Sequence, residues 1–132
     1  MVRVGSKISS WRQVLSGIPQ GSCLGPLLFL IYIRDMGSDI SPEEGKVYKF
    51  VDNSKLIQGV KNVDDMELFQ DTVDKLYKWQ NDNNMKFNAL KFQVLRFGSN
   101  QDLTESTAVK VPDGTTIEAA SSVRDLGIIV ND

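Results

Sequence analysis

The chain contains no histidine and only one cysteine among its 132 residues. Without histidine, neither a Ser-His-Asp nor a Cys-His catalytic site can form, and histidine-ligated zinc is excluded as well. Cys23 alone can form neither an internal disulfide nor a cysteine-cluster zinc site, so we expect a reducing, intracellular setting such as the cytoplasm or nucleus. Any chemistry must therefore rest on carboxylates, lysines or arginines.

The sequence also lacks a strong charge of one sign and a long apolar run. Its formal net charge is -2, which is not the basic footprint of an autonomous nucleic-acid-binding domain. The most apolar stretch, Leu27 to Ile33, is far shorter than a membrane span, and MVRVGSKISSW has no signal-peptide core. We expect neither secretion nor membrane insertion. With 41% hydrophobic residues, the composition fits one domain over residues 1–132.

The first part of the chain predicts a strand pair, a loop and a helix. Val2 to Val4 and Trp11 to Leu15 alternate in polarity around Gly5, as two antiparallel strands would. The glycine- and proline-rich stretch SGIPQGSCLGP predicts an irregular loop. Pro26 suits a helix start, and the apolar run from Leu27 to Ile33 predicts a short helix buried on most sides. A buried strand is the alternative for this run.

The second part predicts a hairpin, a long helix and several strands. The β-type runs Lys46 to Asp52 and Ser54 to Gly59 meet at Asp52-Asn53, a pair that tolerates the positive φ of a tight turn. From Val63 to about Asn83, apolar residues recur at helical spacing. Later strands are expected at Lys91 to Phe97, Val109 to Val111, Thr116 to Glu118 and Leu126 to Val130, with a turn at Pro112-Asp113-Gly114. The predicted fold class is α+β, an antiparallel sheet with two helices packed on one face.

Asp52 allows more than one interpretation. It can be a turn residue without any function. A carboxylate at a hairpin tip is also a good ligand for Mg²⁺, which prefers oxygen donors. Polymerases hold two magnesium ions between carboxylates, because the attacking oxygen and the leaving phosphate are both negatively charged. Three interpretations of Asp52 therefore remain open: a turn residue, a working catalytic acid, or the remnant of a metal site that has lost its other ligands.

Four segments, in order, resemble the reverse transcriptase palm of non-LTR (LINE-type, jockey-like) retrotransposons: SGIPQGSCLGPLLFLIYIRDM, YKFVDNSKLI, NNMKFNALKFQVLRFG and VRDLGIIVND. The first is similar to motif B of that family, the second to the catalytic F-A-D-D motif C, and Asn88 to Lys91 to motif D. Together they cover almost the whole chain. The resemblance implies a palm-type antiparallel sheet and RNA-directed DNA polymerase activity that depends on Mg²⁺. It implies an RNA template, a DNA primer and a deoxynucleotide as partners.

The resemblance also implies roles for residues of motifs B and D. Pro19, Gln20 and Gly21 would lie under the incoming nucleotide and the template base, where a glycine permits close backbone approach. Composition alone predicts only a loop that leads into a helix. Lys91 matches the motif D lysine, which in related polymerases is proposed to protonate the departing pyrophosphate. A solvated surface charge is the alternative for this lysine.

In motif C, Phe50 matches the opening aromatic residue and Asp52 the first metal-binding acid. Asn53 stands where the family has its second acid. At an effective dielectric near 20, a carboxylate and a divalent ion about 4 Å apart interact by roughly 8 kcal/mol before desolvation. Losing even about a quarter of that energy would lower metal occupancy or rate more than roughly tenfold. Asn53 can still ligate a metal through its side-chain oxygen, but weakly.

A second departure from the family pattern concerns motif A, which carries another catalytic aspartate. That motif would precede MVRVGSKISSW, and no other residue obviously replaces it. The fingers and thumb regions of the family also have no counterpart here. We therefore expect this chain alone to be inactive. The alternative is a non-catalytic, domesticated palm-fold binding module, in which exposed strand edges and apolar surface would favour self-association. A reading frame without selected function is a third possibility.

Overall fold

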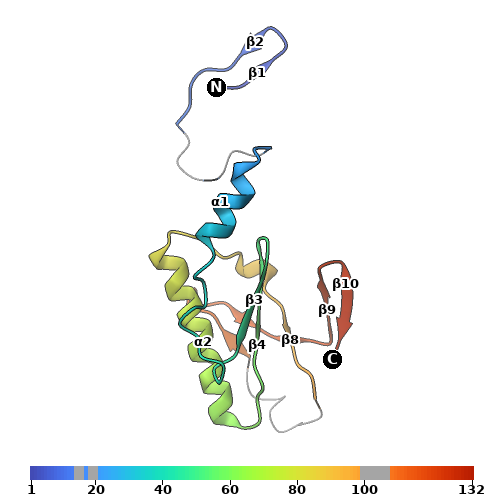
Figure 1. Cartoon of the computed structure of the whole chain (residues 1–132). Helices are drawn as coiled ribbons and strands as arrows, with labels where there is room; N and C mark the ends of the chain where they lie inside the picture. Colours follow the sequence, from blue (N-terminus) through green and yellow to red (C-terminus); the bar gives the residue numbers. More distant parts are fainter. Residues whose placement is uncertain (14–16, 18–20, 99–107) are drawn as a thin grey trace. The chain divides into compact units, whose positions relative to one another are not determined.

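The computed structural model describes residues 1–13, 17, 21–98 and 108–132. These residues form two α-helices, a short 3-10 helix and several short strands, so the predicted α+β class is confirmed (Figure 1). The chain divides into two compact units, Met1–Arg34 and Asp35–Asp132. Neither α-helix of the described residues combines the length and the hydrophobicity that a membrane span requires.

The first unit begins with a small hairpin of β1 (Arg3–Val4) and β2 (Lys7–Ile8). Gly5 has a φ of 59°, so the chain reverses at once after β1. The second strand therefore lies at Lys7–Ile8 and not, as predicted, at Trp11 to Leu15. Trp11 itself lies outside any strand and is exposed, and residues 14 and 15 lie outside the described residues.

The predicted helix forms as α1 (Leu24–Tyr32), and the strand alternative is wrong. The Ser22 hydroxyl accepts a hydrogen bond from the Gly25 amide at 3.0 Å, and Pro26 lies in the first turn, where its missing N–H has no intrahelical partner to lose. The expected burial is wrong, because Leu27, Leu28, Leu30 and Ile31 are all more than half exposed. Among the described residues of this unit, only the two-residue strands β1 and β2 could cover the helix, and they are too small.

The second unit is organised around a hairpin and a long helix. Strands β3 (Lys46–Phe50) and β4 (Asn53–Ile57) pair antiparallel, and α2 (Val63–Asp82) follows. Two hydrogen bonds connect α2 to the open end of the hairpin, opposite the turn. The Thr72 hydroxyl donates to the carbonyl of Glu44 before β3, at 3.3 Å, and the Gln58 amide donates to the carbonyl of Asp65, at 3.0 Å.

Helix α2 has the predicted position because its capping signals are local. The Asn62 side chain accepts a hydrogen bond from the Asp65 amide at 2.8 Å, and Asp64 and Asp65 lie in the first turn, where the helix dipole favours acids. Its inner face contributes much of the core. In the described part of the second unit, the buried side chains are Thr72, Tyr77 and Trp79 of α2, together with Met36, Val109 and Val111.

The connection before β3 is held by a charged contact. Glu44 forms an ion pair with Lys75 of α2, and its other carboxylate oxygen accepts a hydrogen bond from the Ser41 amide at 2.8 Å. The hydrogen bond from Lys75, followed by that from Ser41, lowers the pKa of Glu44 below its ordinary value. The start of β3 is thereby fixed against the middle of α2.

The remaining strands are short. The 3-10 helix η1 (Ala89–Lys91) precedes β5 (Val94–Leu95), which pairs parallel with β8 (Ala119–Ala120). Strands β6 (Val109–Lys110) and β7 (Thr116–Ile117) form an antiparallel pair, as do β9 (Ser122–Asp125) and β10 (Ile128–Asn131). Among the described residues the strands form separate two-stranded pairings, one of them parallel, and not one continuous antiparallel sheet.

One turn prediction and two strand predictions can now be compared with these pairings. The turn at Pro112-Asp113-Gly114 is confirmed, since the Gly114 amide donates to the Val111 carbonyl at 2.9 Å. The strand predicted at Lys91 to Phe97 is confined to Val94–Leu95, because the Asn88 side chain caps η1. The last strand begins at Ile128, since Leu126 and Gly127 have φ values of 47° and 90° and form the turn after β9.

Candidate functional site

The tip of the β3–β4 hairpin is the candidate site. Phe50 pairs with Asn53, so the two residues between them, Val51 and Asp52, form the turn. The prediction that Asp52-Asn53 is the centre of the turn is wrong by one residue. The positive φ falls on Val51, at 54°, and Asn53 is the first residue of β4.

Burial explains why this register is preferred. In the observed pairing, Val47 lies opposite Leu56, and both are half-buried on the same face of the hairpin. A shift of one residue would turn one of these side chains to the other face, because successive side chains in a strand alternate. The apolar pair therefore determines the register, and the turn must accept a valine at positive φ.

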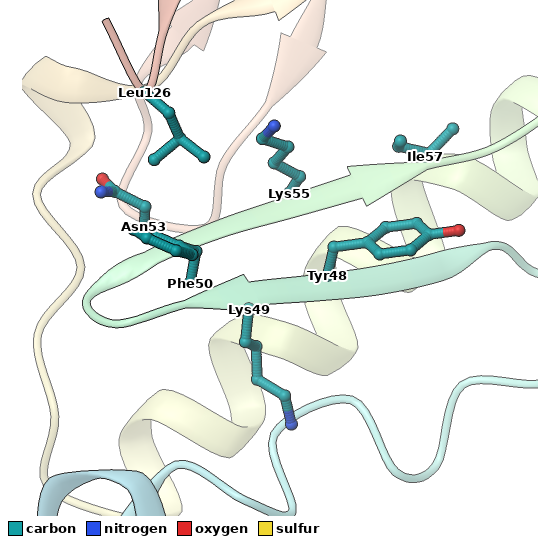
Figure 2. A pocket seen from close by; sticks show the side chains of 7 residues that line it. All are labelled: Tyr48, Lys49, Phe50, Asn53, Lys55, Ile57 and Leu126. Carbon is teal, nitrogen blue, oxygen red and sulfur yellow. The ribbon is translucent and has the colours of Figure 1, made fainter.

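The opposite face of the hairpin presents polar and aromatic side chains together. Tyr48 and Phe50 of β3 lie beside Asn53, Lys55 and Ile57 of β4, and Figure 2 shows these five on one side of the ribbon. Lys49 points to the other side in the same view, where its ammonium group donates to the Met36 carbonyl at 3.0 Å.

A pocket of about 300 Å³ lies on the Tyr48–Phe50 face. Leu126, from the turn between β9 and β10, lies over the end of this face near Phe50 and Asn53 (Figure 2). Lys55 forms an ion pair with Asp125, the residue before Leu126. The β9–β10 hairpin therefore supplies both Leu126, an apolar residue that lines the pocket, and Asp125, the carboxylate that pairs with Lys55 of the pocket.

The residues present do not by themselves fit a complete magnesium site. The hairpin offers one carboxylate, Asp52, and one amide oxygen, on Asn53. Mg²⁺ requires a near-octahedral set of oxygen ligands. Within residues 1–13, 17, 21–98 and 108–132, no three histidine, cysteine, aspartate or glutamate side chains lie close enough together to hold a metal ion. Asp52 could supply one ligand, and Asn53 a weaker one.

The other residues proposed from the sequence lie elsewhere. Lys91 is the exposed last residue of η1, and in the described part of the chain no ion pair or hydrogen bond joins it to Asp52 or Asn53. Gly21 has a φ of 79°, which a residue with a side chain rarely adopts. Pro19 and Gln20 lie outside the described residues, so their predicted contact with a nucleotide stays a prediction.

Comparison with known proteins gives two matches. Over 104 residues, or 74% of the chain, it is 25% identical to the RNA-directed DNA polymerase from mobile element jockey of Drosophila melanogaster. Over 35 residues, or 26% of the chain, it is 54% identical to a probable RNA-directed DNA polymerase from transposon X-element of the same organism. The chain is similar to RNA-directed DNA polymerases.

These matches cover small parts of the relatives, 11% of the jockey protein and 4% of the X-element protein. No family model matches the chain, and no solved structure matches it. The comparisons thus agree with the predicted relationship to retrotransposon polymerases, at the level of a partial match.

Five residues that line the pocket were not identified from the sequence. Besides Lys49 and Ile57, they are Tyr48, Lys55 and Leu126. Strand alternation was a sufficient signal for two of these, because Tyr48 shares a face with Phe50 and Lys55 shares one with Asn53. No local signal indicated Leu126. Its place over the hairpin depends on a contact between segments 70 residues apart, the ion pair of Lys55 with Asp125.

Proposed function

We propose that residues 1–132 form a palm-type segment of the RNA-directed DNA polymerase of a non-LTR retrotransposon. One observation carries the proposal: in a chain similar to such polymerases over 104 residues, an exposed acid, Asp52, lies at the tip of a tight antiparallel hairpin. Asp52 would be the metal-binding acid of motif C, with Phe50 beside the nucleotide. The partners would be an RNA template, a DNA primer and a deoxynucleotide.

The remaining roles follow from the same proposal. Pro19, Gln20 and Gly21 would contact the incoming nucleotide, and Lys91 would donate a proton to the departing pyrophosphate. Mg²⁺, when bound, would stabilise negative charge on the reacting oxygens. Asp52 would hold one ion, and Asn53 would hold it more weakly than the acid of the family.

The proposal includes inactivity of the 132-residue chain by itself. A primer-extension assay with Mg²⁺ or Mn²⁺ should give no detectable DNA synthesis. Asn53→Asp alone should not produce activity, because in the described part of the chain Asp125, the acid beside this hairpin, is paired with Lys55, and no three acids form a group that could hold a metal ion. Robust synthesis by the unmodified chain would overturn this part of the proposal.

Metal binding at the hairpin can be tested separately, by NMR with Mn²⁺, which broadens the signals of nearby amides. Asn53→Asp should tighten binding at the tip by about tenfold or more, because a full charge replaces an amide dipole. Asp52→Asn should abolish the local broadening. Asp113→Asn, a matched change at another exposed turn, should have no effect on the hairpin signals. If Asn53→Asp binds no more tightly than the unmodified chain, Asp52 and residue 53 do not form a metal site.

A non-catalytic palm-fold interaction module is the second candidate. The amide of Asn53 in the family's acid position and the exposed aromatic face at Tyr48 and Phe50 favour it. The two candidates differ in what Asp52 does. The interaction module predicts no localised Mn²⁺ broadening at the hairpin in the unmodified chain, whereas the polymerase segment requires a weak signal there that Asp52→Asn removes.

A further inference from the structure

Among the residues that the structure describes, no strand pairs with the outer edge of β10. In the described part of the chain, β10 pairs only with β9, and β9 in turn lies beside β5. The hairpin of β9 and β10 is therefore the end of this succession of strands, and β10 is its outer member (Figure 1). Strand edges of this kind present unpaired N–H and C=O groups that can pair with another chain.

The backbone groups that point outward can be identified. A two-residue turn joins Asp125 to its partner Ile128, and the Asp132 amide donates to the Ser121 carbonyl at 3.1 Å. Because hydrogen-bonded and non-bonded pairs alternate in an antiparallel ladder, residues 128, 130 and 132 bond to the β9 side. The N–H and C=O groups of Ile129 and Asn131 consequently point away from β9.

The side chains of β10 add nothing that would repel a partner strand. Ile128 and Ile129 are each 69% exposed, and no residue from Ile128 to Asn131 is charged. Uncharged, β-branched strands with an exposed edge are prone to pair with one another.

Strands β3, β4 and β6 are protected at their edges by charge or by a bound side chain. Strand β3 contains Lys46 and Lys49, and β4 contains Lys55 at its centre, so a self-paired β4 would place Lys55 opposite its own copy. The backbone of β6 is occupied by Gln70 of α2. The side-chain amide of Gln70 accepts from the Lys110 amide at 3.0 Å and donates to the Lys110 carbonyl at 2.5 Å.

We propose that β10 forms an antiparallel pair with β10 of a second copy of this chain. A two-fold axis at Val130 would bring Ile129 of each copy opposite Asn131 of the other. Each copy then offers the same two outward N–H and two outward C=O groups, which are mutually complementary in an antiparallel pair. No like charges face each other between Ile128 and Asn131. The proposal does not depend on polymerase function.

Sedimentation equilibrium of the 132-residue chain tests the proposal. The weight-average mass should rise with concentration from 14.7 kDa toward twice that value. Ile129→Lys should raise the dissociation constant about tenfold, since each dimer would then contain two new charges at the paired edge. Leu90→Lys is the matched control, because Leu90 is 96% exposed in η1, and it should leave the dissociation constant unchanged.

Amide hydrogen exchange of the unmodified chain provides a second measurement that needs no variant. The amides of Ile129 and Asn131 should gain protection as concentration rises, whereas the Val130 amide should be protected throughout. A chain that stays at 14.7 kDa at all concentrations would overturn the proposal. So would association that Ile129→Lys leaves intact, or that Leu90→Lys weakens equally, because a different surface would then be responsible.

Discussion

At the scale of single residues, Val51 shows how the hairpin is constrained. A β-branched residue at a φ of 54° is rare, because its Cβ comes too close to the neighbouring backbone. Val51 is also more than half exposed, so burial of its side chain contributes little stabilisation that could offset the strain. The strain is imposed by the register of Val47 and Leu56, and it lies directly before Asp52.

Replacing Val51 with glycine should relieve this strain. Relief of about 1–2 kcal/mol, less the entropic cost of glycine, should raise the free energy of unfolding by roughly 0.5–1 kcal/mol. Urea unfolding checks the change. Ser54→Gly, at a β4 residue without positive φ, is the control and should lower stability by about 0.5–1 kcal/mol. A loss of stability in Val51→Gly would show that the valine makes a contact worth more than the strain.

The same residues show how far local sequence signals extend at a turn. The Asp-Asn pair correctly indicated a hairpin, because these residues favour turns. It misplaced the centre of the turn, because the preference of Asn53 for positive φ is weaker than the burial of Val47 and Leu56. A turn signal identifies a reversal of the chain, whereas the register depends on what packs against the strands.

At the scale of elements, α2 connects the parts of the second unit. Thr72 and Lys75 contact Glu44 before β3, and Gln70 bonds to the backbone of Lys110 in β6. Three side chains of α2 thus bind segments that precede and follow the helix in the sequence. Two predictions test these contacts.

Gln70→Ala should lower the free energy of unfolding by about 1–2 kcal/mol, because two hydrogen bonds to Lys110 are lost. Gln70→Glu separates the two bonds, since a carboxylate can accept from the Lys110 amide but cannot donate to its carbonyl. It should be destabilised as well. Glu67→Ala, an exposed change on the same helix, is the control, and chemical denaturation is the measurement. Equal stability of all three variants would mean that Gln70 does not hold β6.

The Glu44–Lys75 contact should depend on pH. Because the pKa of Glu44 is lowered in the folded state, its charged form stabilises the fold at pH values above the ordinary pKa of 4.5, and this contribution is lost as the pH falls through the lowered value. Glu44→Gln should therefore be less stable than the unmodified chain at neutral pH, and the difference should shrink in acid. Glu43→Gln, at the exposed neighbour whose side chain is not the one paired with Lys75, is the matched control in urea titrations. A difference independent of pH would contradict the assignment.

Elements differ in how well the sequence predicts them, for a physical reason. Helix α2 was predicted nearly to its ends, because apolar residues recur at helical spacing from Val63 to about Asn83, and the structure adds a local cap, the Asn62 side chain, at its start. Strands β5 and β8 pair in parallel across 25 residues, and nothing local to Val94 indicates Ala119 as its partner. Each of these strands also has only two residues, which are too few to show the alternation of apolar and polar side chains that is typical of a strand.

At the scale of the whole molecule, the second unit contains most of the core. Its buried apolar side chains, among the residues that the structure describes, are those of Met36, Tyr77, Trp79, Val109 and Val111. Edge-on contacts of Tyr77 with two phenylalanines, at centroid distances of 5.5 and 6.1 Å, extend the cluster. Among its described residues, the first unit has one buried apolar side chain, that of Ile33. The second unit should therefore contribute most of the free energy of unfolding, because it buries most of the apolar side chains.

A chain of residues 35–132 should therefore fold without the first unit. Its NMR spectrum should retain dispersed signals, with the β3–β4 amides at nearly the same chemical shifts as in the full chain. Residues 1–34 alone should be largely unfolded. A collapsed or random-coil spectrum for residues 35–132 would show that the first unit is required for folding, and the predicted single domain over residues 1–132 would then be favoured.

The contact between Gln70 and Lys110 has a consequence for insertions and deletions. Each residue advances an α-helix by about 100°, so removing one residue between Asn62 and Gln70 would swing the amide to another side of the cylinder. Strand β6, forty positions downstream, would lose its anchor although its own sequence was untouched. The same deletion after Gln80 would leave the direction of the Gln70 side chain unchanged. In related chains that have a deletion in the first two turns of this helix, a residue at a different position of the helix should therefore bind the β6 backbone.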